Sequence, residues 1–251
     1  MHSKTCQGTK AMNKLAIIGY GKMGKSVEKL ANSYGFEICS IIDPTLNNKI
    51  TRQSLNSADV AVEFTTPDTA VNNIISLIDA GTNVVSGSTG WDKHLQQAIN
   101  YCNEKKAGFF YSSNFSIGMN IMFHLNRQFV AMLNKTDKYR LSITETHHAQ
   151  KKDKPSGTAI TLANGIIHNH SAFTKWELAP SQIKDTLPIY SKREGDIIGQ
   201  HAVIAESEDD IITLQHEALS RNAFTTGALM ACKFILNKTG YYTMNDLIFQ
   251  N

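Results

Sequence analysis

The stretch Lys14-Leu15-Ala16-Ile17-Ile18-Gly19-Tyr20-Gly21-Lys22-Met23-Gly24 decides the fold of this chain. Its apolar first half is typical of a buried strand in a parallel sheet. A GxGxxG turn follows, and then apolar residues at helical spacing. Strand, glycine turn and helix in this order bind a dinucleotide, because the glycines let the backbone approach a pyrophosphate at the helix N-terminus. We therefore predict that a nicotinamide dinucleotide contacts Gly19, Tyr20, Gly21, Lys22, Met23 and Gly24.

A second predicted strand, residues 37–42, ends at Asp43. An acid about twenty residues beyond the glycine turn usually accepts hydrogen bonds from the ribose hydroxyls of NAD. The alternative is that Asp43 is only a turn residue before Pro44. No arginine follows Asp43 to bind a 2′-phosphate, although Lys22 could receive one. The cofactor is therefore NADH, NADPH or both.

Three further short apolar runs, residues 59–64, 83–86 and 108–112, are predicted strands of the same sheet. Predicted helices separate them, one capped by Asp68 and running to Ala80, the other over residues 93–105. Such alternation implies a parallel sheet with ligands bound at the carboxyl ends of its strands. The residues that follow these strands are therefore predicted to contact the cofactor: Thr65, Gly87, Ser88, Thr89, Ser112, Ser113, Asn114 and Phe115.

The second half of the chain has a different pattern. A long helix is predicted over residues 117–133, with a core stripe of Ile121, Phe123, Leu125, Phe129 and Met132. Residues 140–145 alternate as a half-buried strand does, and residues 171–195 are irregular and polar. The runs 196–206 and 210–218 predict an antiparallel hairpin, and residues 222–236 are again helical.

These patterns predict an α/β protein in which a Rossmann-like parallel-sheet domain carries an inserted α+β domain with a mostly antiparallel sheet. The dinucleotide-binding domain comprises residues 13–117 and 222–251, and the substrate-binding and oligomerisation domain residues 118–221. Residues 1–12 are polar, and we expect them to form a disordered lead-in.

Composition excludes several classes of function. The 251 residues are 41% hydrophobic and 19% charged, with a net charge of only +3 and no long basic run, so nucleic-acid binding is not indicated. No apolar run is long enough to span a bilayer. Four scattered cysteines without metal-ligand spacing indicate a reduced, cytoplasmic protein.

The chemistry lies in residues 145–159, Glu-Thr-His-His-Ala-Gln-Lys-Lys-Asp-Lys-Pro-Ser-Gly-Thr-Ala. His147 and His148 are consecutive at a strand end, so their side chains point apart, and either histidine or Lys151 can exchange a proton. The amides and hydroxyls of Ser156-Gly157-Thr158 at a helix N-terminus form a carboxylate site. The alternative is a solvated basic loop with a Ser/Thr cap. A metal is not expected, because no third ligand has suitable spacing.

This block, Glu145-x-His147-His148-x-x-Lys151-x-Asp153-x-Pro155-Ser156-Gly157-Thr158-Ala159, closely resembles the signature of the dihydrodipicolinate reductase family. The glycine turn, residues 64–67, 87–90, 114–118 and 195–201, and Ser220-Arg221 resemble further blocks of that family. The glycine turn is one residue shorter than the family's commoner form, and Ser88 stands where threonine is usual.

The resemblance implies an oxidoreductase of the diaminopimelate route to lysine that reduces a cyclic unsaturated dicarboxylate with NAD(P)H. By position, His147 matches the family's proton donor or acceptor and Lys151 its proton donor. His148 matches a substrate contact, and Gly157 and Thr158 match the carboxylate-binding pair, with Ser156 beside them. A homotetramer through the substrate-domain sheet is also implied.

Two alternatives stay open. An amino-acid dehydrogenase acting on aspartate or homoserine would share the N-terminal loops but should lack the His-His-Lys-Pro-Ser-Gly-Thr residues. A regulator that only senses NAD(P) would keep the glycine turn but would need no proton donors, and a gene regulator usually shows a basic helix.

Overall fold

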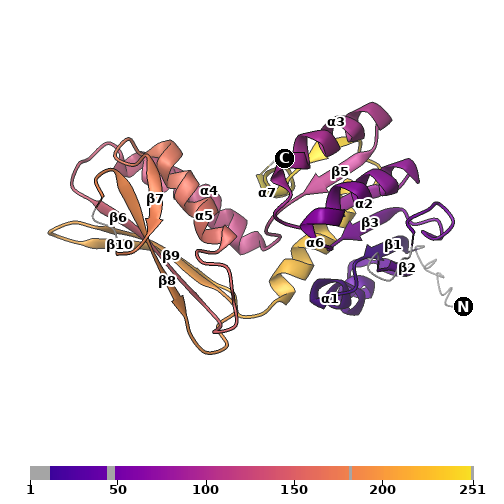
Figure 1. The fold of residues 1–251 in the computed structure, drawn as a ribbon, viewed down its shortest axis with the longest axis horizontal. Helices are drawn as coiled ribbons and strands as arrows, with labels where there is room; N and C mark the ends of the chain where they lie inside the picture. Colours follow the sequence, from indigo (N-terminus) through magenta and orange to yellow (C-terminus); the bar gives the residue numbers. More distant parts are fainter. Residues whose placement is uncertain (1–11, 44–48, 181–182, 250–251) are drawn as a thin grey trace, which may run out of the picture. The chain divides into compact units, whose positions relative to one another are not determined.

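The structure, a computed structural model, describes residues 12–43, 49–180 and 183–249. The predicted lead-in therefore lies outside the described residues, apart from Met12. The chain forms two compact units, one comprising Met1–Ser112 and Ala228–Leu247, the other Ser113–Gly227 and Ile248–Asn251 (Figure 1). In the described part of the chain, no helix combines the length and the apolar character needed to cross a membrane.

The first unit is built on a six-stranded sheet in which every pairing is parallel, which confirms the predicted Rossmann-like fold class. Its strands, in spatial order, are β11 (Gly240–Tyr242), β5 (Gly108–Tyr111), β4 (Asn83–Ser86), β3 (Val60–Glu63), β1 (Asn13–Ile18) and β2 (Phe36–Ile42). Its helices are α1 (Lys22–Ala31), α2 (Pro67–Asp79) and α3 (Leu95–Lys105), with short 3-10 turns η1 (Asn32–Tyr34) and η3 (Asp92–His94).

The short apolar runs form strands because helices cover the sheet and both strand faces are buried. Leu15, Ala16, Ile17 and Ile18 of β1 have no exposed surface. Ala16 and Ile18 belong to the same core cluster as Ile74 and Leu77 of α2. Burial of this kind is the main force that stabilises the unit.

The start of α2 differs from the prediction. Thr66, and not Asp68, is its N-cap, and Pro67 is its first residue. Proline is favoured there because its fixed φ suits a helix and the missing N–H would have no intrahelical partner. The Thr66 amide donates to Thr69 Oγ1 at 3.4 Å.

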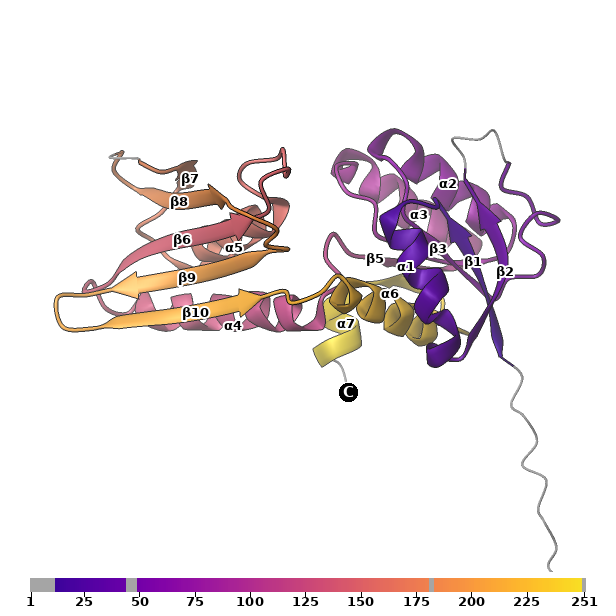
Figure 2. The same cartoon turned by 90° about the horizontal axis from the view of Figure 1, so that it is seen from below.

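The second unit contains a five-stranded sheet, visible in Figure 2, with helices α4 and α5 against one face. Its strands, in spatial order, are β10 (Ile211–Glu217), β9 (Gln200–Glu206), β6 (Arg140–His147), β8 (Thr186–Arg193) and β7 (Lys175–Leu178), and its helices are α4 (Ile117–Leu133) and α5 (Gly157–Asn169). The predicted hairpin of β9 and β10 is confirmed. The pairings of β6 with β8 and of β8 with β7 are parallel, so the sheet is mixed.

Residues 171–195 are not an irregular excursion, because β7 and β8 lie within them. In β8 the polar Ser191 and Arg193 lie on the core side, opposite Glu145 and His147 of β6, while Tyr190 lies on the other face, so apolar and polar residues do not alternate. β7 has only four residues. The apolar stripe predicted for α4 is also partly wrong: Ile121, Leu125 and Met132 are exposed. The core positions of α4 are Met119, Met122, Phe123, Val130 and Leu133.

After β10, the chain forms α6 (Asn222–Ile235), close to its predicted bounds. The sixth strand, β11, was not predicted from the sequence and pairs in parallel with β5. The apolar run at residues 244–249 is a short helix, α7 (Met244–Phe249).

Candidate active site

The residues predicted to bind the cofactor in the first unit follow adjacent strands at one edge of the sheet. Backbone hydrogen bonds continue the strand pairing into these loops: the Gly19 amide donates to Ile42 O at 2.8 Å, and the Gly87 amide donates to Glu63 O at 2.9 Å. The turn at Gly19–Gly24 is thereby held beside the end of β2, where Asp43 lies half-buried. The loops containing Thr65, Gly87–Thr89 and Ser112 follow β3, β4 and β5 at the same edge.

The glycines of the turn fit a dinucleotide in the way that the sequence predicts. A Cβ on Gly19 would lie 2.2 Å from Phe64 O, and one on Gly24 would lie 2.3 Å from Gly19 O, so both positions are closed to any side chain. A Cβ on Gly21 would meet nothing within 4 Å. Gly21 is also the N-cap of α1, and no side chain caps this helix. The turn therefore leaves open space and helix amides where a pyrophosphate would bind.

Glu63, at the end of β3, connects two of these loops. Its carboxylate accepts hydrogen bonds from Ser86 Oγ at 2.6 Å, Ser88 Oγ at 2.9 Å and the Thr65 amide at 3.1 Å, as well as from the Thr65 hydroxyl. Burial raises the pKa of Glu63, and the hydrogen bonds from Ser86, Thr65 and Ser88 oppose this increase. The residue pattern alone does not identify Glu63, which looks like one more member of a buried strand.

Ser113, Asn114 and Phe115 belong to the second unit, apart from the other predicted cofactor residues. The Asn114 side-chain amide donates to Thr158 Oγ1 at 3.3 Å. The structure thus brings a predicted cofactor residue next to a predicted substrate residue.

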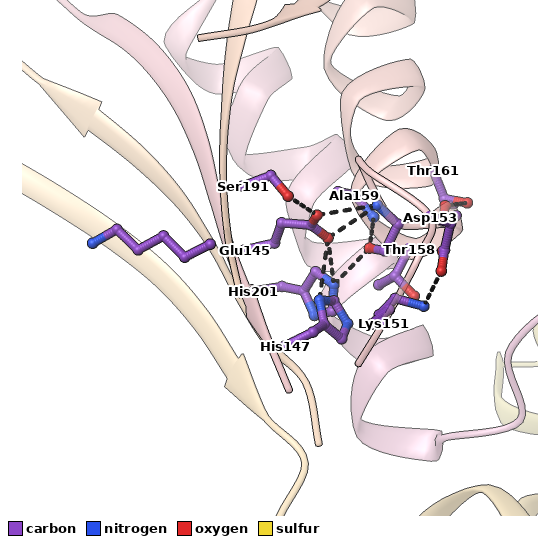
Figure 3. Close-up of polar contacts among 12 residues, drawn as sticks. Glu145, His147, Lys151, Asp153, Thr158, Ala159, Thr161, Ser191 and His201 are labelled. Atoms are coloured by element: carbon purple, nitrogen blue, oxygen red, sulfur yellow. Dashed lines mark hydrogen bonds and ion pairs between the residues drawn. The ribbon is translucent and has the colours of Figure 1, made fainter. Parts of the chain in front are cut away.

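The predicted catalytic block surrounds a buried carboxylate, that of Glu145 (Figure 3). Leu141, Ile143, Glu145 and His147 alternate along β6 and face the core. The Ser156 amide donates to both Glu145 oxygens at 3.1 Å, and the Ser191 hydroxyl donates to Oε1.

Arg193 completes this network from β8. Its Nη2 lies 3.2 Å from Glu145 Oε1. Its Nε donates to Lys151 O at 3.2 Å, and its Nη2 also donates to Asp153 O. The pair of Glu145 and Arg193 therefore fixes the loop that carries Lys151.

Glu145 and the neighbouring His147 both have shifted pKa values. Burial alone would raise the pKa of Glu145, but hydrogen bonds from His201, Ser156 and Ser191 outweigh it and hold the pKa well below 4.5. Burial lowers the pKa of His147 from 6.5 to about 4. The neighbouring His201, Lys151 and Arg193 act in the same direction, and the Glu145 carboxylate opposes them. His147 is therefore a neutral imidazole at neutral pH.

The helix α5 begins next to Glu145. Ser156 is its N-cap, and Ser156 Oγ accepts from the Ala159 amide at 3.2 Å and lies 3.1 Å from His201 Nε2. Gly157 is exposed, and a Cβ there would meet nothing within 4 Å. The amides of Gly157 and Thr158 thus stand at an open helix N-terminus, where an anion is favoured.

The remaining residues of the block have different surroundings. Lys151 Nζ forms an ion pair with Asp153 Oδ1 at 2.9 Å. His148 is half-buried and, unlike the buried His147, does not face the core. Lys152 and Lys154 are exposed, as expected for surface charges.

The structure supplies the third potential metal ligand that the spacing lacks. Ligand atoms of Glu145, His147 and His201 lie within 4.8 Å of one another. However, the Glu145 oxygens already accept from Ser156, Ser191 and Arg193, and the neighbouring Lys151 and Arg193 are cations. A metal ion would have to displace these donors and withstand the positive charges, so this donor set fits hydrogen bonding better.

Neither Arg193 nor His201 can be identified as a site residue from local pattern. His201 is opposite Glu145 in the register of β6 and β9, and Arg193 is opposite His147 in the register of β6 and β8. One signal was available for Glu145 itself: an acid on the buried face of an alternating strand requires partners.

Comparison with known proteins agrees with this arrangement. The sequence matches two family profiles, described as Dihydrodipicolinate reductase, N-terminus, over residues 13–115, and Dihydrodipicolinate reductase, C-terminus, over residues 118–248. A 4-hydroxy-tetrahydrodipicolinate reductase from Christiangramia forsetii is 38% identical over 93% of this chain and 97% of its own length. The protein of the same name from Thermosipho africanus is 36% identical over 94% of this chain and 97% of its own.

Two solved structures share the fold. The dipicolinate-bound dihydrodipicolinate reductase from Paenisporosarcina sp. TG-14 has a TM-score of 0.76 at 24% identity and covers 95% of this chain and 100% of its own. GenD2 from gentamicin A biosynthesis, in complex with NAD, has a TM-score of 0.56 at 11% identity and covers 98% of this chain and 93% of its own. With both halves of the chain matched and relatives above 30% identity over nearly its whole length, the protein belongs to the dihydrodipicolinate reductase family.

Proposed function

We propose that the protein is a 4-hydroxy-tetrahydrodipicolinate reductase, which uses a reduced nicotinamide cofactor to form tetrahydrodipicolinate in the diaminopimelate route to lysine. The observation that carries this proposal is the open N-terminus of α5 beside Lys151 and His147, in a chain of this family. Residues 13–117 and 222–251 act as the cofactor domain, and residues 118–221 act as the substrate and oligomerisation domain.

The helix N-terminus holds a substrate carboxylate. The Gly157 and Thr158 amides donate to it, and Ser156 keeps these amides in place by capping the helix. His148 contributes a further polar contact. A dicarboxylate suits this site because cationic groups and helix amides converge at it.

Lys151 delivers the proton in this proposal. His147 is neutral at neutral pH because burial lowers its pKa to about 4, so it has no imidazolium proton to give. The Lys151 ammonium has three N–H donors and is oriented by Asp153 at 2.9 Å. His147 then acts as a neutral hydrogen-bonding partner in the site.

The cofactor, when bound, supplies a hydride to the substrate ring. The turn at Gly19–Gly24 and the amides of α1 hold its pyrophosphate, and the loops at Thr65, Gly87–Thr89 and Ser112–Phe115 hold its nicotinamide half. Asp43 accepts from the adenosine ribose, and its negative charge disfavours a 2′-phosphate. We therefore expect NADH to be the preferred cofactor, with NADPH accepted through Lys22. A cytoplasmic location belongs to the same proposal.

The test is to follow NADH and NADPH oxidation on addition of freshly prepared dihydrodipicolinate. We expect turnover by the wild type. Lys151→Ala should lower kcat by about 100-fold or more, as is usual when a proton-transfer group is lost, and His147→Gln should lower it similarly because it removes a hydrogen-bonding imidazole from the site. Lys152→Ala is the matched control, because it removes an exposed lysine from the same loop and should leave kcat unchanged. Absence of turnover with both cofactors would refute the proposal.

A further inference from the structure

Glu63 is a buried carboxylate without a cation. Its side chain has no exposed surface, and none of the ion pairs formed by residues 12–43, 49–180 and 183–249 includes it. A buried charge is expensive unless it is paired, so its position requires an explanation. The proposed chemistry of the substrate site leaves Glu63 without a role.

The surrounding hydrogen bonds are directed toward an anion. Ser88 Oγ accepts from the Thr65 amide at 2.7 Å, so its own proton is free to reach Glu63 Oε1 at 2.9 Å. Thr65 Oγ1 likewise accepts from Asn73 Nδ2 at 3.0 Å and donates to Glu63. These bonds offset part of the cost of burial, and a cation brought to this edge would offset more of it.

From the sheet topology we expect the nicotinamide half of the cofactor to lie near Glu63. The pyrophosphate belongs at the turn after β1, and the adenosine ribose belongs at Asp43 after β2, on one side of β1. The nicotinamide half must then extend to the other side, over the ends of β3 and β4. Glu63 ends β3, and Ser86 and Ser88, which hold its carboxylate, end β4 and begin the next loop.

We propose that the Glu63 carboxylate strengthens binding of the oxidised nicotinamide relative to the reduced one. This inference rests on the proposed use of a nicotinamide cofactor. When the hydride leaves with two electrons for the substrate ring, the nicotinamide ring gains one positive charge, and the substrate takes its proton from Lys151. The ionised form of Glu63 favours the charged product of this step. Because burial raises the pKa of Glu63, the effect is strongest at alkaline pH. The pyrophosphate is common to both cofactor forms, so its repulsion by Glu63 cancels in their comparison.

The experiment measures the Kd of NADH by fluorescence and the Kd of NAD+ by competition, on the whole protein at one mildly alkaline pH. Glu63→Gln keeps the size of the side chain and removes its charge. We expect this variant to raise the ratio of the NAD+ Kd to the NADH Kd by about 10-fold, the size expected for one charge at several ångströms in a partly buried site. Glu104→Gln, on the exposed surface of α3, is the matched control and should leave the ratio unchanged. NADPH and NADP+ are measured in the same way.

Glu63→Asp is the second variant, and it tests the inference even if Glu63→Gln does not fold. It keeps the charge but shortens the side chain, so both affinities should fall while their ratio stays within about three-fold of the wild type. Glu63 only supports the loops, and the inference is wrong, if Glu63→Gln raises the Kd of NADH and the Kd of NAD+ by the same factor. The inference is also wrong if Glu63→Asp changes the ratio of the two Kd values as strongly as it changes each Kd. If the wild type binds no nicotinamide cofactor, the proposed function fails as well.

Discussion

Glu145 is the residue on which the proposed substrate site depends. Its oxygens accept from the amide of Ser156, the N-cap of α5, and from Arg193, which also binds the backbone of Lys151 and Asp153. One carboxylate therefore fixes both the helix N-terminus that we propose binds the substrate and the loop that carries the proposed proton donor. Its surroundings are buried, so these bonds are only weakly screened by salt.

Replacing Glu145 with glutamine should lower the free energy of unfolding by about 3 kcal/mol, because it leaves the largely buried Arg193 without its counter-charge. Chemical denaturation measures this change. Glu206→Gln is the matched control: Glu206 faces Arg140 at 4.0 Å with both side chains mostly exposed, so we expect less than about 1 kcal/mol. Equal effects of the two substitutions would contradict the role given to Glu145.

The free energy of unfolding that Glu145→Gln loses should depend on pH and should become smaller in acid. The pKa of folded Glu145 lies below its ordinary 4.5, so the stabilisation is complete above 4.5 and is lost as the pH falls toward the folded value. The difference between wild type and Glu145→Gln should therefore shrink below pH 4.5. His147 adds to the acid sensitivity of the wild type, because its neutral form is favoured on folding and stability falls between pH 6.5 and about 4.

The site residues that sequence alone predicts are those in continuous stretches. One such stretch contains His147, Lys151 and Ser156–Thr158 within a few residues of one another. Their spacing and the rules for helix capping are therefore enough to predict them. Arg193 and His201 reach Glu145 through strand pairing across more than forty residues of sequence. Long-range register of this kind has no local signal, because it depends on which strands become neighbours.

At the scale of elements, the first strand, turn and helix illustrate what local pattern can achieve. The tight turn and the helix after it follow from residues 14–24, and the parallel sheet follows from the alternation of predicted strands and helices as far as residue 112. The strand β8 is not predicted because polar Ser191 and Arg193 stand on its core face, where they bind Glu145. The strands β7 and β11, of four and three residues, are too short for their patterns to be informative.

Substitutions at two glycines of the turn should separate effects on stability from effects on cofactor binding. Gly24→Ala should lower the free energy of unfolding by about 2 kcal/mol, because its Cβ would lie 2.3 Å from Gly19 O. Gly21→Ala should change stability by less than about 1 kcal/mol, since φ is −77° and nothing lies within 4 Å of the Cβ.

The same Gly21→Ala variant should weaken NADH binding by about 10-fold or more, because a methyl group occupies the space into which the pyrophosphate comes. Calorimetric titration with NADH, beside thermal unfolding, measures both quantities. Unchanged NADH affinity in a folded Gly21→Ala protein would contradict the cofactor site at this turn.

At the scale of the whole molecule, the sheet of the second unit has a face that no described helix covers. Tyr190, Ile204 and Ile211 lie on this face, on β8, β9 and β10, and Tyr190 and Ile211 are 47% and 64% exposed. Exposed apolar side chains on an uncovered sheet face favour association with another chain. We propose that it forms the interface of a homotetramer.

Light scattering on the purified protein tests this assembly. We expect a mass of four chains for the wild type and a smaller mass for Ile204→Glu, because the substitution would bury a charge at the interface. Leu125→Glu, on the exposed side of α4, should keep the wild-type mass. A monomeric wild type would contradict the proposed assembly.

The central claim is that this chain transfers a hydride from a nicotinamide cofactor to a cyclic dicarboxylate. The most direct measurement uses NADH and NADPH carrying deuterium at C4 on both faces, with fresh dihydrodipicolinate and mass spectrometry of the product. We predict tetrahydrodipicolinate that carries one deuterium, formed by the wild type and almost absent with Lys151→Ala. No tetrahydrodipicolinate with either cofactor, or a product without deuterium, would contradict the account.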